Sequence, residues 1–186
     1  MSGANQLELT PRQLYGGAMT ISLPASFVDV SQVRQIPDNQ EVFVNMQNDQ
    51  SVIVELLELE AEVADADAGK HHFDTLAAAN EAESASEVLR VDTLGVADVP
   101  RFPPSTAASL LTGRQLVAKF NKKDRDIVDI YLAVVRLREH TTDVLVSFNL
   151  PRPAGDLDVP APMDADAVRQ CVSTLAVLDY GLFGGS

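Results

Sequence analysis

The chain has 186 residues and a mass of 20.0 kDa, which is the size of one ordinary domain. Hydrophobic residues make up 46% and charged residues 22%, so wholesale disorder is excluded. The formal net charge of −13 argues against nucleic acid and anionic membranes as partners, because both are themselves negatively charged. We expect a single domain over residues 1–186, with residues 1–12 as a flexible N-terminal arm.

Features that report on cellular location point to a soluble intracellular protein. The first ten residues, MSGANQLELT, show neither a basic amphipathic stretch nor the apolar core of a signal peptide. No run approaches the ~18 apolar residues that a membrane span needs. Cys171 is the single cysteine, so an internal disulfide is excluded.

The first half of the chain predicts two strands followed by two helices. Residues 18–23 and 41–46 alternate side chains as half-buried strands do. Asp49 is then a candidate N-cap for a helix over residues 51–63, where apolar side chains recur at helical spacing. A second helix is expected over residues 71–82.

The second half of the chain predicts mainly strands. Residues 109–120 have a strand pattern that is interrupted at Thr112-Gly113, so they form either a tight hairpin or a bulged strand. A last helix is expected after Asp164, with one apolar stripe that runs as far as Leu182. Three more strands are expected over residues 87–92, 127–137 and 144–150.

The strands at 127–137 and 144–150 are joined by a short loop, and the first of them is apolar on both faces. Such a strand is covered on both sides. Strands that return through short loops, together with helices, predict an antiparallel sheet covered by helices. The expected class is α+β.

Catalytic and cofactor signatures are weak. No glycine-rich phosphate loop is found, and Gly16-Gly17 is expected to be a turn or a close approach. His71, His72 and Asp74 are candidate metal ligands, but a solvent-facing histidine pair, or one buried and one exposed histidine, explains them better. Cys171 falls on an apolar helix stripe, where a thiol is inert. We therefore expect no metal, no cofactor and no enzyme chemistry.

Charge is concentrated in the first half of the chain. Residues 1–100 carry 17 acidic and four basic side chains, whereas residues 101–186 carry ten of each. Nine acidic residues and no basic residue lie between Arg34 and Lys70. On the helix expected over 51–63, Glu55 and Glu58 would share one face with Glu62. Composition leaves two interpretations open, a solvated acidic face or a docking surface for a basic partner.

Three blocks of the sequence carry a family resemblance: LYGGAMTISLPASFVDVSQVRQIPDNQEVFVN (14–45), QSVIVELLELE (50–60) and AVVRLREHTTDVLVSFNLP (133–151). Together they resemble the Mog-type Ran guanine-nucleotide release factors. The resemblance implies a six-stranded, mainly antiparallel sheet with helices on both faces, akin to the extrinsic oxygen-evolving subunit of photosystem II.

The resemblance also implies a function. It implies binding to the small GTPase Ran, release of its bound guanine nucleotide and support of nuclear import, in the nucleus and cytoplasm. The family's Ran-contacting carboxylates fall on Asp29, Asp38 and Glu41 in the loop and strand, and on Glu55 and Glu58 of the expected helix. The protein alone is expected to be a monomer.

Two other functions stay open at this stage. The first is an acidic adaptor that binds a basic trafficking partner without releasing nucleotide. The second is an enzyme built around the candidate metal ligands His71, His72 and Asp74, or around Cys171. A nucleotide-release assay separates the first from a release factor, and bound metal or a reactive thiol would support the second.

Overall fold

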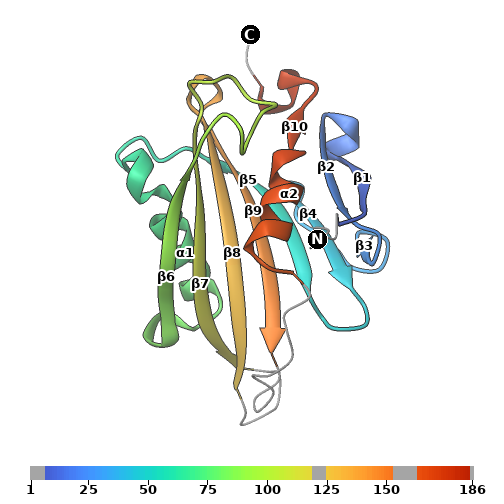
Figure 1. Ribbon diagram of the computed structural model, residues 1–186, viewed down its shortest axis with the longest axis vertical. Helices are drawn as coiled ribbons and strands as arrows, with labels where there is room; N and C mark the ends of the chain where they lie inside the picture. Colours follow the sequence, from blue (N-terminus) through green and yellow to red (C-terminus); the bar gives the residue numbers. More distant parts are fainter. Residues whose placement is uncertain (1–6, 119–124, 153–162, 185–186) are drawn as a thin grey trace, which may run out of the picture.

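The structure, a computed structural model, describes residues 7–118, 125–152 and 163–184 (Figure 1). Its strands are β1 (Leu9–Leu14), β2 (Met19–Pro24), β3 (Phe27–Asp29), β4 (Gln40–Asn45), β5 (Ser51–Glu58), β6 (Ser86–Leu94), β7 (Ala107–Ala118), β8 (Arg125–Leu137), β9 (Thr142–Arg152) and β10 (Ala176–Val177). Its α-helices are α1 (Ala68–Ala79) and α2 (Ala165–Ser173). Short 3-10 turns are η1 (Tyr15–Gly17), η2 (Asp65–Asp67), η3 (Glu83–Ala85), η4 (Arg138–His140) and η5 (Tyr180–Phe183).

The described strands form two antiparallel sheets. The main sheet has seven strands in the order β3-β4-β5-β9-β8-β7-β6, and the small sheet has three in the order β1-β2-β10. The α+β class predicted from the sequence is confirmed. The main sheet has one strand more than the six expected, because short β3 extends its edge beside β4.

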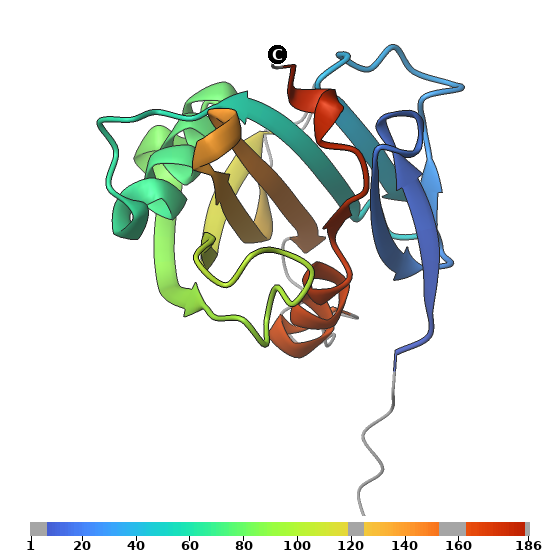
Figure 2. The same ribbon diagram turned by 90° about the horizontal axis from the view of Figure 1, so that it is seen from above.

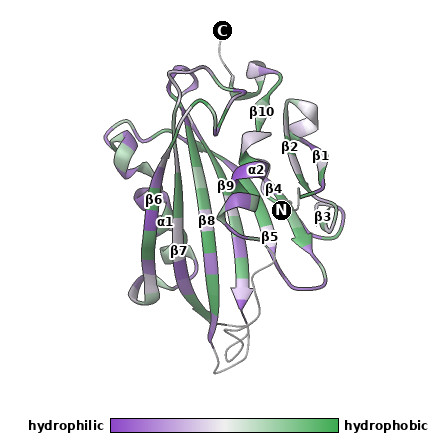
Figure 3. Cartoon of the chain, in the orientation of Figure 1, coloured by the Kyte–Doolittle hydropathy of each residue, from purple (hydrophilic) through white to green (hydrophobic). Residues whose placement is uncertain are grey.

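The centre of the main sheet is the meander β7-β8-β9, whose long strands pair over almost their full length. On β8, Ile130, Leu132 and Val134 face one way and Ala133 and Val135 face the other, and all five are buried. Hydrophobic residues accordingly follow this strand along most of its length (Figure 3). The prediction that both faces are covered is confirmed.

The two faces of the main sheet pack against different elements, as the views in Figures 1 and 2 show together. Helix α1 covers one face, where Ala68 and Phe73 join Ile130, Leu132 and Val134 in a small core. Helix α2 and the small sheet lie on the other face, where a larger core forms around buried side chains such as Phe43 and Phe148. No described helix has both the length and the apolar character to cross a membrane.

Helix α2 begins as the sequence predicts and ends earlier. The Asp164 carboxylate accepts a hydrogen bond from the Ala167 backbone N–H at 2.8 Å, which is an N-cap. The helix ends at Ser173, and the Thr174 hydroxyl then accepts from the Ser22 N–H at 2.8 Å. The chain beyond it pairs with β2 as β10, so Leu178 is 64% exposed instead of lying on a buried helix stripe.

The helix expected over residues 51–63 is wrong. Residues 51–58 form β5, which lies between β4 and β9 in the sheet. Asp49 is not an N-cap: its φ is +58°, and its backbone N–H bonds the Asn45 carbonyl in the turn that joins β4 to β5. The β-branched run Val52-Ile53-Val54 favours a strand once neighbouring strands are available on both sides. Pairing across the sheet therefore overrides the helical spacing.

The interruption at Thr112-Gly113 is neither a hairpin nor a bulge in β7, which continues through both residues. The irregularity lies in the partner strand β6, between Val88 and Arg90. Gly113 has a packing role, because a Cβ atom built there would lie 2.6 Å from two ring atoms of Phe73. The glycine leaves room for α1 to pack closely on the sheet.

The variant Gly113→Ala should lower the free energy of unfolding by about 1–3 kcal/mol, the usual cost of overpacking a core. Phe73 is 1% exposed, so its ring has nowhere to move without disturbing α1. Urea denaturation of both proteins measures the difference. Gly95→Ala is the control, because its added Cβ would meet nothing closer than 3.9 Å. Equal stabilities of the two variants would contradict this packing account.

The remaining expectations compare simply with the structure. The strands expected at 18–23 and 41–46 correspond to β2 and β4, and the helix expected at 71–82 is α1, which begins three residues earlier. Residues 9–12 of the expected N-terminal arm belong to β1, whereas residues 1–6 lie outside the described part.

Candidate functional site

The five acidic residues that the family resemblance matches to Ran contacts gather at one end of the main sheet. Strand β3 ends at Asp29, β4 begins at Gln40, and β5 ends at Glu58. Antiparallel pairing places Asp29 beside Phe43 and Glu55 beside Gln40, so the three strands share this end. We call it the acidic end; its carboxylates are Asp29, Asp38, Glu41, Glu55 and Glu58.

The acidic end does not present its carboxylates as the sequence led us to expect. On a helix, Glu55 and Glu58 would lie on one face, but on β5 they are three residues apart and point to opposite faces. Glu55 shares its face with Gln40, and Glu41 shares the other face with Val54. The carboxylates therefore surround the end of the sheet instead of forming one stripe.

Three of these carboxylates are already hydrogen-bonded within the protein. Asp29 accepts from the Ser31 backbone N–H at 2.8 Å, and Glu41 accepts from the Tyr15 backbone N–H at 2.6 Å. Glu55 accepts from the Gln40 side-chain amide at 3.2 Å.

The other two, Asp38 and Glu58, are exposed and have no hydrogen-bond or ion-pair partner among the described residues. They are the two carboxylates of the acidic end whose charge is free to meet a partner without breaking an internal bond.

Tyr15 ties the glycine turn η1 to the acidic end. Its hydroxyl lies 3.0 Å from both the Asn39 and the Val54 carbonyl oxygens and can donate a hydrogen bond to either. Burial, with the nearby carboxylates Glu41 and Glu55 as smaller causes, raises the pKa of this phenol. Sequence reasoning missed this role, although the Tyr-Gly-Gly turn was visible: Gly16 has a φ of +67°, which favours glycine.

The position of Glu55 in the fold disfavours the ionised form of its carboxyl. Its carboxyl is half buried, and this burial raises its pKa, while the hydrogen bond from Gln40 and the nearby His72 lower it in part. The folded protein therefore binds a proton at this site more tightly than the unfolded chain does. The contribution of Glu55 to the free energy of unfolding is therefore largest below its pKa in the unfolded chain. It is lost as the pH rises through the higher pKa of the folded protein.

Replacing this carboxyl with a neutral amide should remove that pH dependence. We expect the stability of Glu55→Gln relative to the original protein to be higher at pH 7 than at pH 4. At pH 7 the original side chain is a carboxylate, whose burial costs more solvation than burial of the neutral amide. Melting temperatures of both proteins across this range give the measurement. A difference that stays constant with pH would show that burial of Glu55 has no such cost.

A second set of charged residues holds the segment that follows β5. Arg136 on β8 faces Asp143 on β9, and its Nε donates to the carboxylate at 3.0 Å. The other oxygen of Asp143 lies 2.8 Å from His72 Nε2. All three side chains are buried, with Asp143 at 0% exposure. A buried carboxylate shared by two partners is a costly arrangement that persists only when it is well satisfied.

The same arginine reaches the chain between β5 and η2. Its guanidinium donates to the Glu60 carbonyl at 2.9 Å, to the Val63 carbonyl at 2.6 Å and to the Asp65 carboxylate at 3.0 Å. Arg138 also pairs with Asp65. We call Arg136, Asp143 and His72 the buried charge network. The sequence signal for it is a charged residue, Arg136, that follows directly on the apolar run of β8.

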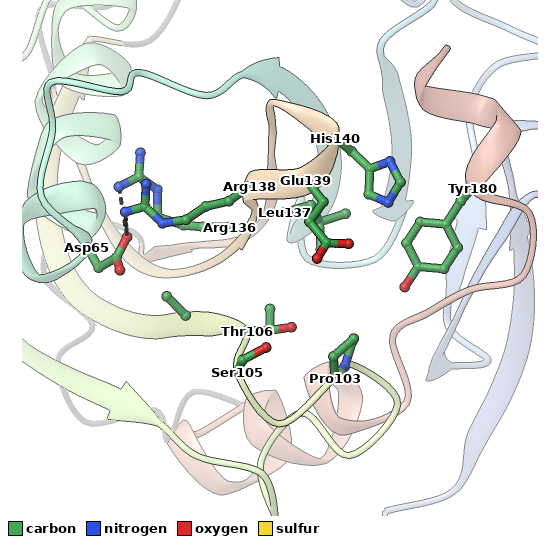
Figure 4. A pocket seen from close by; sticks show the side chains of 11 residues that line it. Asp65, Pro103, Ser105, Thr106, Arg136, Leu137, Arg138, Glu139, His140 and Tyr180 are labelled. Atoms are coloured by element: carbon green, nitrogen blue, oxygen red, sulfur yellow. Dashed lines mark hydrogen bonds and ion pairs between the residues drawn. The ribbon is translucent and has the colours of Figure 1, made fainter. Parts of the chain in front are cut away.

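A cavity of about 580 Å³ opens next to this network (Figure 4). Its walls are the loop before β7, turn η4 and the start of η5, and its side chains include Ser105, Thr106, Arg138, Glu139 and Tyr180. The His140 ring stacks on the Tyr180 ring, with the two ring centroids 4.7 Å apart.

The candidate metal ligands do not converge in the structure. His72 belongs to the buried charge network, and Asp74 pairs with Lys70 on the surface of α1. Within the described ranges, no group of three or more histidine, cysteine or acidic side chains could hold a metal ion. Cys171 is fully buried, and burial raises its pKa to about 12, so the thiol is not a nucleophile at neutral pH.

Comparison with known proteins identifies the family of the chain. Residues 12–151 match the model of a family described as Ran-interacting Mog1 protein. The Ran guanine nucleotide release factor of Danio rerio is 40% identical over 185 residues, which cover 93% of this chain and 99% of that protein. The nuclear import protein mog1 of Schizosaccharomyces pombe is 34% identical over 174 residues, covering 88% and 90% respectively.

Solved structures are similar over nearly the whole chain. The crystal structure of the Saccharomyces cerevisiae Ran-binding protein Mog1p aligns with a TM-score of 0.73 at 28% identity, covering 96% of this chain and all of that one. The cyanobacterial PsbP of Synechocystis aligns with a TM-score of 0.56 at 15% identity over 95% and 96% of the two chains, which shows a shared fold alone. From its sequence and its fold, the chain belongs to the Ran-interacting Mog1 protein family.

Proposed function

We propose that the protein binds the small GTPase Ran and promotes release of its bound guanine nucleotide, in support of nuclear protein import. The observation that carries this proposal is the near full-length similarity to a protein named as a Ran guanine nucleotide release factor. The protein acts as a regulator without covalent chemistry of its own. It works as a monomer in the nucleus and cytoplasm.

The acidic end is the surface that we assign to Ran. A protein with net charge −13 attracts basic partners, and complementary charge both speeds encounter and selects the partner. Asp38 and Glu58 make the first contacts, because neither is occupied by an internal bond. Asp29, Glu41 and Glu55 keep their internal hydrogen bonds and add negative potential around these two.

Nucleotide release follows from differential affinity. A ligand shifts an equilibrium only when it binds one state more tightly than the other, so this protein binds nucleotide-free Ran more tightly than loaded Ran. Carboxylates of the acidic end engage Lys or Arg side chains near the nucleotide site of Ran. Those basic groups then lose their alignment with the phosphates, and the nucleotide departs faster.

Mixing the purified protein with Ran that carries a fluorescent guanine nucleotide should accelerate loss of the fluorescence signal in the presence of excess unlabelled nucleotide. Ran alone gives the basal rate. Binding of Ran without acceleration would support the adaptor function in place of release. Failure to bind Ran in either nucleotide state would overturn the proposal.

A further inference from the structure

The cavity beside turn η4 contains a carboxylate without a partner. Glu139 points into the space between η4 and the loop that carries Pro103 and Ser105 (Figure 4). It has no hydrogen-bond or ion-pair partner among the described residues. The hydroxyl groups of Ser105, Thr106 and Tyr180 line the same space and can each accept a hydrogen bond.

The positive charges of the cavity are already neutralised. Arg136 is bonded to Asp143 and Asp65 as well as to two backbone carbonyls, which occupies most of its donors. Arg138 is paired with Asp65. The carboxylate of Glu139 is therefore the charge that remains for a ligand, and it favours a cation over an anion.

Aromatic rings form the far wall of the cavity. Of these rings, His140 and Tyr180 line the cavity and stack with an angle of 28° between their planes. The Phe183 ring lies outside the lining, with its centroid 5.4 Å from that of His140. A planar cation can lie against the face of such rings and be attracted by their electrons. A guanidinium has this planar shape and can also donate two parallel hydrogen bonds to one carboxylate, whereas an ammonium group cannot.

The cavity adjoins the acidic end. Glu58, the last residue of β5, is paired with Thr142 at the start of β9, and the Leu59 N–H donates to the Thr141 carbonyl at 2.9 Å. Turn η4, which joins β8 to β9, therefore lies next to the end of β5. A protein bound at the acidic end can extend a side chain into this space.

We propose that the cavity receives an arginine side chain of the bound GTPase partner, with Glu139 as its carboxylate anchor and the His140–Tyr180 pair as its stacking wall. This rests on the proposed function for the identity of the partner. The cavity itself can be tested without that partner, so the two proposals can fail separately.

The first test uses a small probe and the unmodified protein. Nα-acetyl-arginine methylamide is titrated into ¹⁵N-labelled protein, with the neutral isostere Nα-acetyl-citrulline methylamide as control. Amide shifts should move in residues 105–107, 137–140 and 180 with the arginine probe and stay fixed with citrulline. Equal shifts with both probes, or shifts there with inorganic phosphate and not with arginine, would overturn the proposal.

The second test uses the partner. The near-isosteric Glu139→Gln should weaken Ran binding about tenfold, the loss expected when a charge-assisted hydrogen bond is removed. Glu83→Gln is the matched control, since Glu83 is exposed on η3 and precedes β6 at the opposite end of the sheet. Unchanged affinity in Glu139→Gln, alongside normal Ran binding by the original protein, would refute the cavity and leave the proposed function standing.

Discussion

Replacing Asp143 with leucine should destabilise the protein by about 3–5 kcal/mol, the usual cost of removing one partner of a buried ion pair. The carboxylate is 0% exposed and satisfies both Arg136 and His72. Without it, the Arg136 guanidinium stays buried next to an apolar side chain. Urea denaturation followed by circular dichroism measures the loss.

The double variant Arg136→Met/Asp143→Leu distinguishes unpaired charge from lost packing. Both residues lie opposite each other on β8 and β9, so two apolar side chains of similar length can fill the same space. We expect the double variant to be more stable than Asp143→Leu alone, because no buried charge remains. The single variant Arg136→Met completes the comparison. If the losses of Arg136→Met and Asp143→Leu add up to the loss of the double variant, the two side chains do not interact energetically.

The same pair of variants reports on the segment after β5. Arg136 donates to the carbonyls of Glu60 and Val63, and these contacts are absent in the double variant whatever its stability. Hydrogen exchange should therefore accelerate around residues 60–65 in the double variant while β7 and β9 stay protected. Such a result would show that the buried charge network also holds residues 60–65 in place.

Strands β2 and β4 were predictable because their side chains alternate, but β5 was not. In SVIVELLE, apolar side chains at 52, 53, 54, 56 and 57 fit a helix face and a strand buried on both sides equally well. Its true structure is decided by pairing with β9, almost a hundred residues later in the chain. No local pattern contains that information.

The candidate site was likewise predictable from the sequence only in part. Its five carboxylates could be named from the resemblance, whereas their directions depended on the structure of β5. The internal bond from Tyr15 to Glu41 joins segments 26 residues apart, and the bond from His72 to Asp143 joins segments 71 apart. Such contacts follow from tertiary folding, and a single sequence does not specify them.

Charge reversal at the two free carboxylates should have the largest effect on Ran. We expect Asp38→Lys/Glu58→Lys to reduce affinity by about 100-fold or more, because each change replaces an attraction with a like-charge repulsion. Binding is measured by titration with nucleotide-free Ran. Stability should change little, since neither carboxylate has a partner among the described residues.

The control for this double reversal makes the same change in net charge at two glutamates outside the acidic end. Glu8 precedes β1 and Glu83 lies on η3, both exposed and away from the acidic end. If Glu8→Lys/Glu83→Lys weakens Ran binding as much as Asp38→Lys/Glu58→Lys, overall charge decides binding and the acidic end is not the docking surface. A local surface also predicts that added salt slows association of the original protein more than that of Asp38→Lys/Glu58→Lys, because steering between exposed charges is screened beyond about 10 Å at 0.1 M.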